Sequence, residues 1–290
     1  MMTLTLSFLR TALPAFHFNP SRWKPNSENT ARRPEKQGQV DLVGAGPGDP
    51  DLITRKGWKA LLQADVVVYD ALVSDALMAE IPAQVQRLYV GKRKGAHSAS
   101  QAEICQLLVE LAQQGKRVVR LKGGDPLVFG RLTEEMDALR QHCIPFTLVP
   151  GITAAAGCAA SCKIPLTERE KAPRLRLITA HSCDDRPIDW ADLARTDETL
   201  VFYMGLSMAD SISTELQCHG LPADWPVLLV ERGTHEDQRA VRAELGSMTR
   251  MIQDNDLQTP TLILVGRVVE HYDANLGAEQ LLESLMEEQR

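Results

Sequence analysis

The chain has 290 residues, of which 44% are hydrophobic and 24% charged, and its net charge is −6. Residues 1–38 carry six Lys or Arg and two acids, so the remaining body has a charge of −10. This acidic body argues against nucleic acid as a partner, because non-specific binding depends on clustered Lys and Arg. No apolar run in the sequence reaches the length of a membrane span, which argues against a membrane partner.

Residues 1–38 are predicted to be an N-terminal extension that is disordered or removed by processing. The apolar stretch from Leu4 to Phe16 is interrupted by Arg10, and no small-residue cleavage site follows it. The extension is acid-poor and contains Arg and Ser, so it also faintly resembles an organelle transit peptide. That alternative stays open.

Short apolar runs alternate with helical patterns between residues 39 and 151. Strands are predicted at Val40–Val43, Val66–Tyr69, Leu88–Val90, Val118–Leu121 and Phe146–Val149. Amphipathic helices are predicted at Asp51–Gln63, Gln101–Gln114 and Glu134–Gln141. Because such alternation produces right-handed crossovers, residues 39–151 are predicted to form an N-terminal α/β domain with a parallel sheet.

A second α/β domain is predicted over residues 152–270. It opens with an Ala-rich helix at Thr153–Ala160. Strands are predicted at Leu175–Thr179, Leu200–Met204, Val227–Val230 and Leu262–Val265, with Arg239–Glu244 as a further, antiparallel strand. Residues 271–290 are predicted to form a C-terminal helical tail with apolar residues on one side. The predicted fold class is α/β: two α/β domains with a cleft between them.

The six cysteines occur singly, without a CxxC pair. No His/Cys pair has metal-ligand spacing, so no metal site is predicted. Cys158 and Cys162 stand one helical turn apart. Reduced, partly buried thiols are typical of a reducing compartment, so the predicted location is the cytoplasm.

The loop Gly123-Gly124-Asp125 is the most informative feature of the chain. It follows a predicted buried strand, and ligands of open α/β sheets bind outside the carboxyl ends of the strands. Two glycines let the backbone approach a ligand closely, and Asp125 adds a fixed acceptor. A simple turn does not need this combination, so the loop is predicted to bind a ligand.

The first strand ends in a second glycine-rich loop, Gly44 to Pro50. Its spacing does not match the dinucleotide-binding motif GxGxxG, because Asp49 stands where the third glycine is required. Pro47 and Pro50 also stiffen a loop that should present free N–H groups to a pyrophosphate. The loop is therefore predicted to bring its backbone close to a different ligand.

Titratable side chains follow the next two strands. Asp70 is a candidate base, and Lys92 is a candidate proton donor or a charge that stabilises an anion. The alternative interpretation is that Asp70 caps a turn and that Lys92 belongs to a solvated loop. Residue type alone favours this alternative interpretation.

Other candidate ligand-binding residues lie further along the chain. Arg131 and Glu134 are three apart on one helix face and can act together. The most basic stretch of the body contains Arg169, Lys171, Arg174 and Arg176. Guanidinium groups bind carboxylates bidentately, so this stretch suits a polycarboxylate ligand, with a solvated charge run as the alternative.

Two residues of the second domain complete the candidate set. Met204 offers a soft, apolar contact for a flat ring or a thioether-like ligand. Gly233 permits close backbone approach, although packing or turn formation explains either residue equally well.

The chain from about Val40 to Val269 resembles the tetrapyrrole methylase family, and within it the uroporphyrinogen-III C-methyltransferases. The segments that carry the resemblance are VGAGPGDP, VVYD, VGKRKG, VRLKGGDPLVFGR, VPGITAAAG, IPLTER, FYMG and RGT. Each segment is weak alone, but the ordered set is highly specific. The resemblance implies two α/β domains in the tetrapyrrole methylase fold, which is unlike the Rossmann-type methyltransferase fold, and usually a homodimer.

The resemblance also implies an activity and a set of site residues. The implied reaction is S-adenosylmethionine-dependent C-methylation of uroporphyrinogen III at positions 2 and 7, which gives precorrin-2. The implied proton acceptor is Asp70 and the implied donor is Lys92, while substrate binding is implied for Arg131, Glu134 and Arg169. The family's positions for S-adenosylmethionine in the interdomain cleft correspond to Pro47, Gly123, Gly124, Asp125, Val128, Thr153, Ala154, Met204 and Gly233.

The sequence departs from the family pattern near the implied substrate residues. Glu168 stands where the family usually has His, and Glu170-Lys171 stands where it commonly has Asp-Tyr. A carboxylate at 168 is expected to weaken a substrate clamp at Arg169. Two alternatives therefore stay open: methylation of a later corrinoid precursor, and a catalytically silent cofactor-binding scaffold. The 38-residue extension is too short for the dehydrogenase–ferrochelatase domain of fused siroheme synthases, so we expect precorrin-2 to be the final product.

Overall fold

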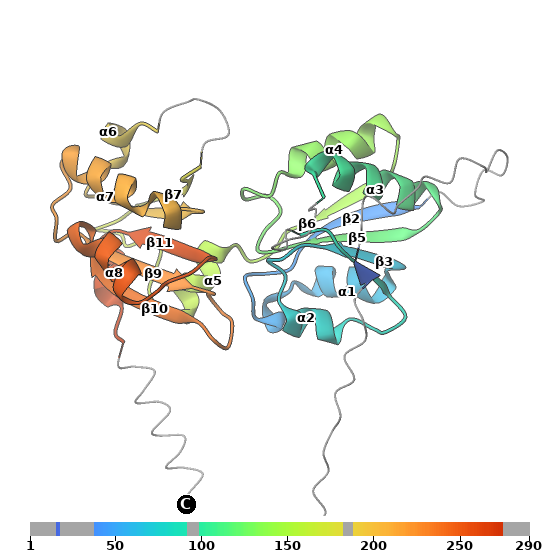
Figure 1. The fold of residues 1–290 in the computed structure, drawn as a ribbon, viewed down its shortest axis with the longest axis horizontal. Coiled ribbons are helices and arrows are strands. Elements are labelled where there is room, and N and C mark those ends of the chain that lie inside the picture. Colours follow the sequence, from blue (N-terminus) through green and yellow to red (C-terminus); the bar gives the residue numbers. More distant parts are fainter. Residues whose placement is uncertain (1–15, 18–37, 92–98, 182–187, 275–290) are drawn as a thin grey trace, which may run out of the picture.

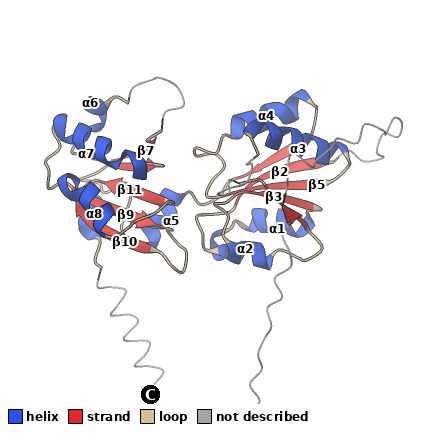
Figure 2. Ribbon diagram, viewed as in Figure 1, coloured by secondary structure: helices blue, strands red, loops and turns tan. Residues whose placement is uncertain are grey.

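Two β-sheets, each packed between helices, account for most of the computed structural model of this chain (Figure 1). The structure describes residues 16–17, 38–91, 99–181 and 188–274. Lys92 and the tail beyond residue 274, which includes most of the predicted C-terminal helix, lie outside the described residues. Figure 2 shows that strands and helices alternate along both halves of the chain.

The first sheet has six parallel strands in the order β1-β4-β3-β5-β2-β6. Its strands are β1 (Phe16–His17), β2 (Gln39–Gly44), β3 (Val66–Tyr69), β4 (Gln86–Tyr89), β5 (Arg117–Lys122) and β6 (Phe146–Val149). The central strands are mostly apolar, as expected for a parallel sheet that is covered on both sides, although β5 also carries the buried Arg120 and Lys122. All their carboxyl ends meet at one edge, where the glycine-rich loops follow.

Helices cover both faces of this sheet. They are α1 (Arg55–Gln63), α2 (Asp75–Glu80), α3 (Gln101–Gln113) and α4 (Leu132–Gln141), with a short 3-10 helix η1 (Pro50–Leu52). α3 and α4 pack their apolar residues on one face, and α1 and α2 pack theirs on the other. α3 begins with a capping box, in which Ser100 accepts from the Glu103 N–H and the Glu103 carboxylate accepts from the Ser100 N–H.

The second sheet has five strands in the order β10-β9-β11-β8-β7. Its strands are β7 (Arg174–Thr179), β8 (Glu198–Tyr203), β9 (Pro226–Glu231), β10 (Arg239–Glu244) and β11 (Thr261–Val265). Only β7 and β8 pair in parallel, whereas β11 pairs antiparallel with both β8 and β9. β10 also pairs antiparallel with β9, which confirms the prediction for residues 239–244.

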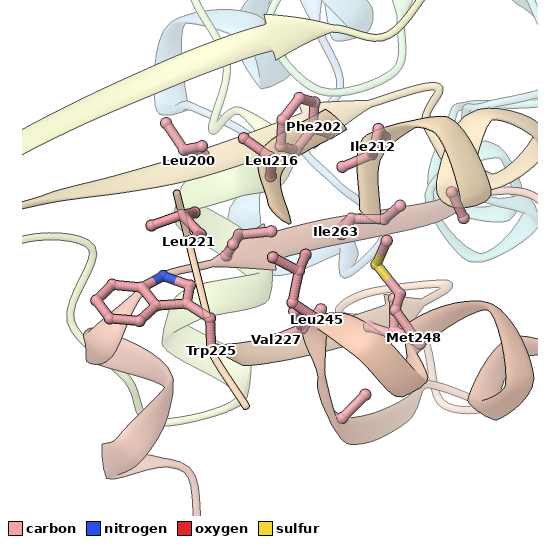
Figure 3. Packing of buried hydrophobic residues seen from close by; sticks show 14 of the residues in the cluster. Leu200, Phe202, Ile212, Leu216, Leu221, Trp225, Val227, Leu245, Met248 and Ile263 are labelled. Atoms are coloured by element: carbon pink, nitrogen blue, oxygen red, sulfur yellow. The ribbon is translucent and has the colours of Figure 1, made fainter. Parts of the chain in front are cut away.

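Helices also cover both faces of the second sheet. They are α5 (Ala154–Ser161), α6 (Trp190–Leu193), α7 (Ala209–Cys218) and α8 (Met248–Asp254), with the 3-10 helices η2 (Leu206–Met208), η3 (Leu245–Ser247) and η4 (Arg267–His271). Figure 3 shows the core on the α7 and α8 side, where Phe202 and Ile263 of the sheet meet Ile212, Leu216 and Met248. α5 and η4 pack on the opposite face.

The predicted fold class of two α/β domains is confirmed, and most predicted elements lie within two residues of their observed bounds. One exception is the single helix predicted over Asp51–Gln63, which is interrupted at Ile53-Thr54. Pro50 opens η1, and the Thr54 side chain then accepts from the Gly57 N–H and starts α1. The six-residue α2 was not predicted. Within the predicted extension, β1 pairs in parallel with β4.

No helix of the described residues is long and apolar enough to cross a membrane.

Candidate active site

The loops that follow β2 and β5 are bonded to each other at the carboxyl edge of the first sheet. The Gly46 N–H donates to the Gly124 carbonyl at 3.1 Å, and the Gly124 N–H donates to the Gly46 carbonyl at 2.7 Å. Both glycines have positive φ, +82° and +66°, which explains why glycine occupies them. The two loops that the sequence singled out therefore form one structure.

The loop after β6 joins this pair by close backbone packing. A Cβ on Gly44 would lie 2.6 Å from the Gly151 backbone, and a Cβ on Gly151 would lie 2.2 Å from the Gly124 carbonyl oxygen. Real Cβ atoms do not make such contacts, so these positions require glycine. A Cβ on Gly123 would likewise lie 2.4 Å from the Leu72 Cβ.

The segment after Gly124 forms a tight turn that exposes apolar side chains. The Asp125 carboxylate accepts from the Leu127 N–H at 3.0 Å, and its carbonyl accepts from the Val128 N–H at 3.1 Å. Leu127 and Phe129 are exposed, and Phe129 has a φ of 52°, an uncommon conformation for an aromatic residue. Strained backbone and exposed apolar groups together are typical of a binding site.

The second unit of the chain, formed by the second sheet and its helices, reaches the same edge through Tyr203 at the end of β8. Its hydroxyl lies 2.7 Å from Thr153 Oγ1 and accepts from the Ala155 N–H at 3.0 Å. Its ring contacts the Phe129 ring, with 5.1 Å between centroids. Burial raises the pKa of Tyr203. The next residue, Met204, is exposed and has a φ of 54°.

The loop after β9 closes on the loop after β2. Thr234 Oγ1 accepts from the Asp49 N–H at 3.0 Å. On α5, a Cβ on Gly157 would lie 2.4 Å from Pro47 Cγ, and a Cβ on Gly233 would lie 2.2 Å from Cys158 Sγ. Pro47 and Gly233 therefore pack against the same helix.

These contacts bring into one region most of the residues for which the resemblance implies cofactor binding. Gly124 lies against the start of α5, since a Cβ on Gly124 would lie 3.7 Å from the Ala154 nitrogen. Pro47 and Gly233 meet further along α5, and Val128 and Met204 are next to the contacting rings of Phe129 and Tyr203.

Asp70 lies at the end of β3 and is held at both carboxylate oxygens. Its Oδ2 accepts from Arg120 Nη2 at 2.9 Å, and its Oδ1 accepts from the Leu72 N–H at 3.1 Å. The Asp70 side chain is 24% exposed, whereas that of Arg120 is 3% exposed. Asp70 is therefore accessible but fixed in orientation.

Arg120 belongs to a buried charge network that the sequence analysis missed. Glu135, which is fully buried, accepts at Oε1 from Arg120 Nε at 3.2 Å, from Lys122 Nζ at 2.9 Å and from Gln101 Nε2 at 3.2 Å. Burial and the charge of Arg120 lower the pKa of Lys122. Burial disfavours the Arg120 cation, but Asp70 and Glu135 outweigh that effect and raise its pKa.

The signal for this network was present in the helical spacing. Glu135 stands four residues before Leu139, so the two share a face of α4, and Leu139 is fully buried. Glu134, the neighbour to which the resemblance gave a role, points outward. It accepts from Arg131 Nε at 2.9 Å and Nη2 at 2.8 Å, and both side chains are about half exposed or more.

Arg131 borders a pocket on the first unit. The pocket has a volume of about 370 Å³. It is lined by residues of the loop and first turns of α4, together with Leu148: Pro126, Leu127, Phe129, Gly130, Arg131, Leu132, Thr133 and Met136. An exposed guanidinium beside an apolar pocket suits an anionic, largely apolar ligand.

The arginines of the basic stretch at 169–176 differ in their surroundings. Arg174 pairs with Asp197, and Arg176 pairs with Asp192 and, at 2.8 Å, with the buried Glu198. These two arginines are therefore paired with acids of the second sheet and its helices, and the hypothesis that the stretch binds carboxylates stays a prediction. Arg169 is exposed.

Glu168 does not act on Arg169 as expected. Its Oε2 lies 3.0 Å from His271 Nε2, and its Oε1 lies 3.5 Å from Lys171 Nζ. The hydrogen bond with His271 lowers the pKa of Glu168, with Lys171 contributing. The carboxylate is thus balanced by two basic groups rather than by its neighbour in sequence.

No group of His, Cys, Asp and Glu suited to a metal ion occurs within the described ranges. Lys92 lies outside them, so its predicted role stays a prediction.

Comparison with known proteins places this geometry in a family. A profile of the tetrapyrrole (corrin/porphyrin) methylases matches residues 39–249, which include both sheets' glycine-rich loops. The chain belongs to the tetrapyrrole methylase family. Siroheme synthase 2 of Yersinia enterocolitica is 53% identical over 233 residues, which are 80% of this chain and 49% of that protein. The chain thus spans about half the length of the curated relatives it matches.

Solved structures of tetrapyrrole methylases share the fold. A cobalt precorrin-4 methyltransferase has a TM-score of 0.72 at 30% identity, over 80% of this chain and 95% of that one. Uroporphyrin-III C-methyltransferase from Thermus thermophilus, in complex with S-adenosyl homocysteine, has a TM-score of 0.69 at 38% identity, over 80% and 93%.

Proposed function

We propose that this chain methylates uroporphyrinogen III at positions 2 and 7, with S-adenosylmethionine as the methyl donor, and that the product is precorrin-2. The observation that carries the proposal is the bridge between Gly46 and Gly124, which lies against the start of α5. A relative of known structure with S-adenosyl homocysteine bound is 38% identical to this chain.

The residues present fit this cofactor. The backbone segments lie too close together for side chains at Gly44 and Gly151, and Gly124 has a φ of +66°, so main-chain groups are available to a ligand. Asp125 adds a carboxylate, while Met204 and Leu127 add exposed apolar contacts. We assign cofactor binding to Pro47, Gly123, Gly124, Asp125, Val128, Thr153, Ala154, Met204 and Gly233.

When bound, S-adenosylmethionine supplies an electrophilic methyl group on a sulfonium. The chain's own contribution is to align a pyrrole carbon with that group and to take up the proton that the tetrapyrrole ring loses. We assign the proton uptake to Asp70, whose carboxylate is partly exposed and held by Arg120 and the Leu72 N–H. Lys92 is proposed as the proton donor.

Substrate binding is proposed for Arg131, Glu134 and Arg169. The acetate and propionate groups of uroporphyrinogen III match guanidinium donors, and Arg131 borders the apolar pocket of about 370 Å³. Glu134 holds the Arg131 guanidinium through two hydrogen bonds and so sets its direction. Arg169 is exposed, and the acid beside it is balanced by His271 and Lys171.

We also propose that the protein works as a homodimer in the cytoplasm, with no nucleic-acid or membrane partner. The five cysteines of the described residues are free thiols, which suits a reducing compartment. The domains are proposed to divide near residue 151, between β6 and α5.

A pair of substitutions tests the chemical assignment. Asp70→Asn keeps the shape of the side chain but removes its capacity as a base, so we expect the turnover of uroporphyrinogen III to fall about 10²-fold or more. Binding of S-adenosyl homocysteine, measured by calorimetry, should stay unchanged. The control is Asp210→Asn on the exposed side of α7, which should retain full turnover. Equal turnover in both variants would contradict the role of Asp70.

A further inference from the structure

The charge network around Glu135 occupies a place where apolar side chains would pack. Val118 lies two residues before Arg120 on the same face of β5, and Leu139 lies one turn after Glu135 on α4. Both are fully buried in the apolar core between this sheet and its helices. Buried ion pairs pay a large desolvation cost, and apolar residues of similar volume often stabilise a fold as well or better. Stability therefore does not account for the network.

The network instead fixes the direction of Arg120 Nη2, which donates a hydrogen bond to Asp70. The guanidinium of Arg120 is planar and rigid, so a partner at Nε fixes the direction of Nη2. Glu135 Oε1 holds Nε at 3.2 Å, and Nη2 then reaches Asp70 Oδ2 at 2.9 Å. Nη1 is held separately by the Leu121 carbonyl at 2.9 Å. Glu135 thus acts on Asp70 through a single side chain.

The same residue also anchors the first turn of α4. Arg131 and Glu134 face outward from this turn, whereas Glu135 faces inward and is bound to Lys122 at the end of β5. One carboxylate consequently connects the strand that fixes Asp70 with the helix turn that carries the proposed substrate pair. Its Oε2 has no hydrogen-bond partner among the described residues, so all its bonds converge on Oε1.

We propose that Glu135 is a positioning residue, which acts through Arg120 to orient Asp70 for proton uptake and holds the start of α4 in register with it. Lys122 is a buried counter-charge to Glu135, with its Nζ 2.9 Å from Glu135 Oε1. This role rests on the proposed methyl transfer, but the positioning itself is a structural statement that can be tested without substrate.

The first test is the variant Glu135→Gln, with Asp137→Asn as the control. Asp137 is an exposed acid on the same helix, paired with Arg140. In a crystal structure of Glu135→Gln, Arg120 Nη2 should turn away from Asp70 Oδ2. The kcat for uroporphyrinogen III should fall about 10²-fold, because small displacements of a reacting group cost this much. The Kd for S-adenosyl homocysteine should stay unchanged, and Asp137→Asn should behave as the parent protein.

A charge-balanced variant protects this test against simple misfolding. Lys122→Met/Glu135→Gln removes one charge of each sign, so we expect its melting temperature to match the parent's while kcat remains low. A retained contact between Arg120 and Asp70 in Glu135→Gln would overturn the inference, as would a loss of S-adenosyl homocysteine binding equal to the loss of kcat. If the parent protein does not methylate uroporphyrinogen III, the proposed function fails, and the crystal structure of the variant still decides the positioning role.

Discussion

Gly151 packs on Gly124 so closely that a Cβ on Gly151 would lie 2.2 Å from the Gly124 carbonyl oxygen. That carbonyl also accepts from the Gly46 N–H at 3.1 Å. The loops that follow β2, β5 and β6 therefore all meet at the Gly124 carbonyl oxygen. The chain continues from Gly151 into α5, so this contact lies directly before the first helix that covers the second sheet.

The substitution Gly151→Ala should separate these loops. The added Cβ has to displace backbone atoms, which cannot move as a flexible side chain does, so we expect binding of S-adenosyl homocysteine to weaken at least about tenfold together with a loss of stability. Titration calorimetry and thermal unfolding measure the two effects. The control is Gly220→Ala, where the φ of +115° adds strain but no atom lies within 4 Å. Gly220→Ala should lose stability alone, and an equal loss of affinity there would contradict the account.

Gly233 offers a test in which the clash can be relieved. A Cβ there would lie 2.2 Å from Cys158 Sγ, while the next atoms are 3.4 Å away. Gly233→Ala should therefore weaken binding of S-adenosyl homocysteine, and the double variant Cys158→Ala/Gly233→Ala should recover most of the loss. Additive losses in a double-mutant cycle would show that the two residues do not interact.

The buried thiols predict an alkaline limit to stability. Burial raises the pKa of Cys158 to about 12, whereas an unfolded thiol ionises near its ordinary value of about 8.5. Between these values the native state keeps a proton that the unfolded state loses. The free energy of unfolding should therefore fall as pH rises, by up to about 1.4 kcal/mol per pH unit from this thiol.

The matched pair for that prediction is Cys158→Ala and Cys218→Ala. Cys218 is exposed at the end of α7, so its removal should leave the pH dependence unchanged. Urea unfolding at a series of pH values above about 8.5 measures the slope, and the difference from the parent isolates Cys158 from other groups. An identical slope in Cys158→Ala would contradict the prediction.

Arg131 and Arg140 allow the proposed substrate contact to be tested on one helix. Both are exposed and both pair with an acid three residues away. A charged hydrogen bond contributes about 1.5–3 kcal/mol, so Arg131→Ala should raise the KM for uroporphyrinogen III at least about tenfold. Arg140→Ala should leave KM unchanged. Similar KM values for the two variants would remove Arg131 from the substrate site.

The sequence predicted the strands well for a physical reason. Parallel strands that are buried on both faces are continuous apolar runs, and β3 and β6 match their predicted bounds. α2 has only six residues, too few to show a helical period, and its start depends on the Ser74 cap. The mixed order of the second sheet depends on long connections, which local patterns do not encode.

The sequence predicted the glycine-rich loops of the site but not its buried ion pairs. Glycines at Gly123-Gly124 and around Gly46 reveal close backbone approach in the sequence itself. The acidic partners of Arg120 and Arg176 lie 15 to 50 residues away in the sequence. Only the folded chain therefore shows that Arg120 holds Asp70 and that Arg176 is paired with acids. The choice between Glu134 and Glu135 depended on which helix face is buried.

The most direct test is anaerobic incubation of the purified protein with uroporphyrinogen III and S-adenosylmethionine, followed by mass spectrometry of the tetrapyrrole. Oxygen is excluded because porphyrinogens oxidise. We predict the gain of two methyl groups. A tetrapyrrole that gains none, while S-adenosyl homocysteine still binds the protein, would contradict the proposed function and favour a different corrinoid substrate or a silent cofactor-binding role.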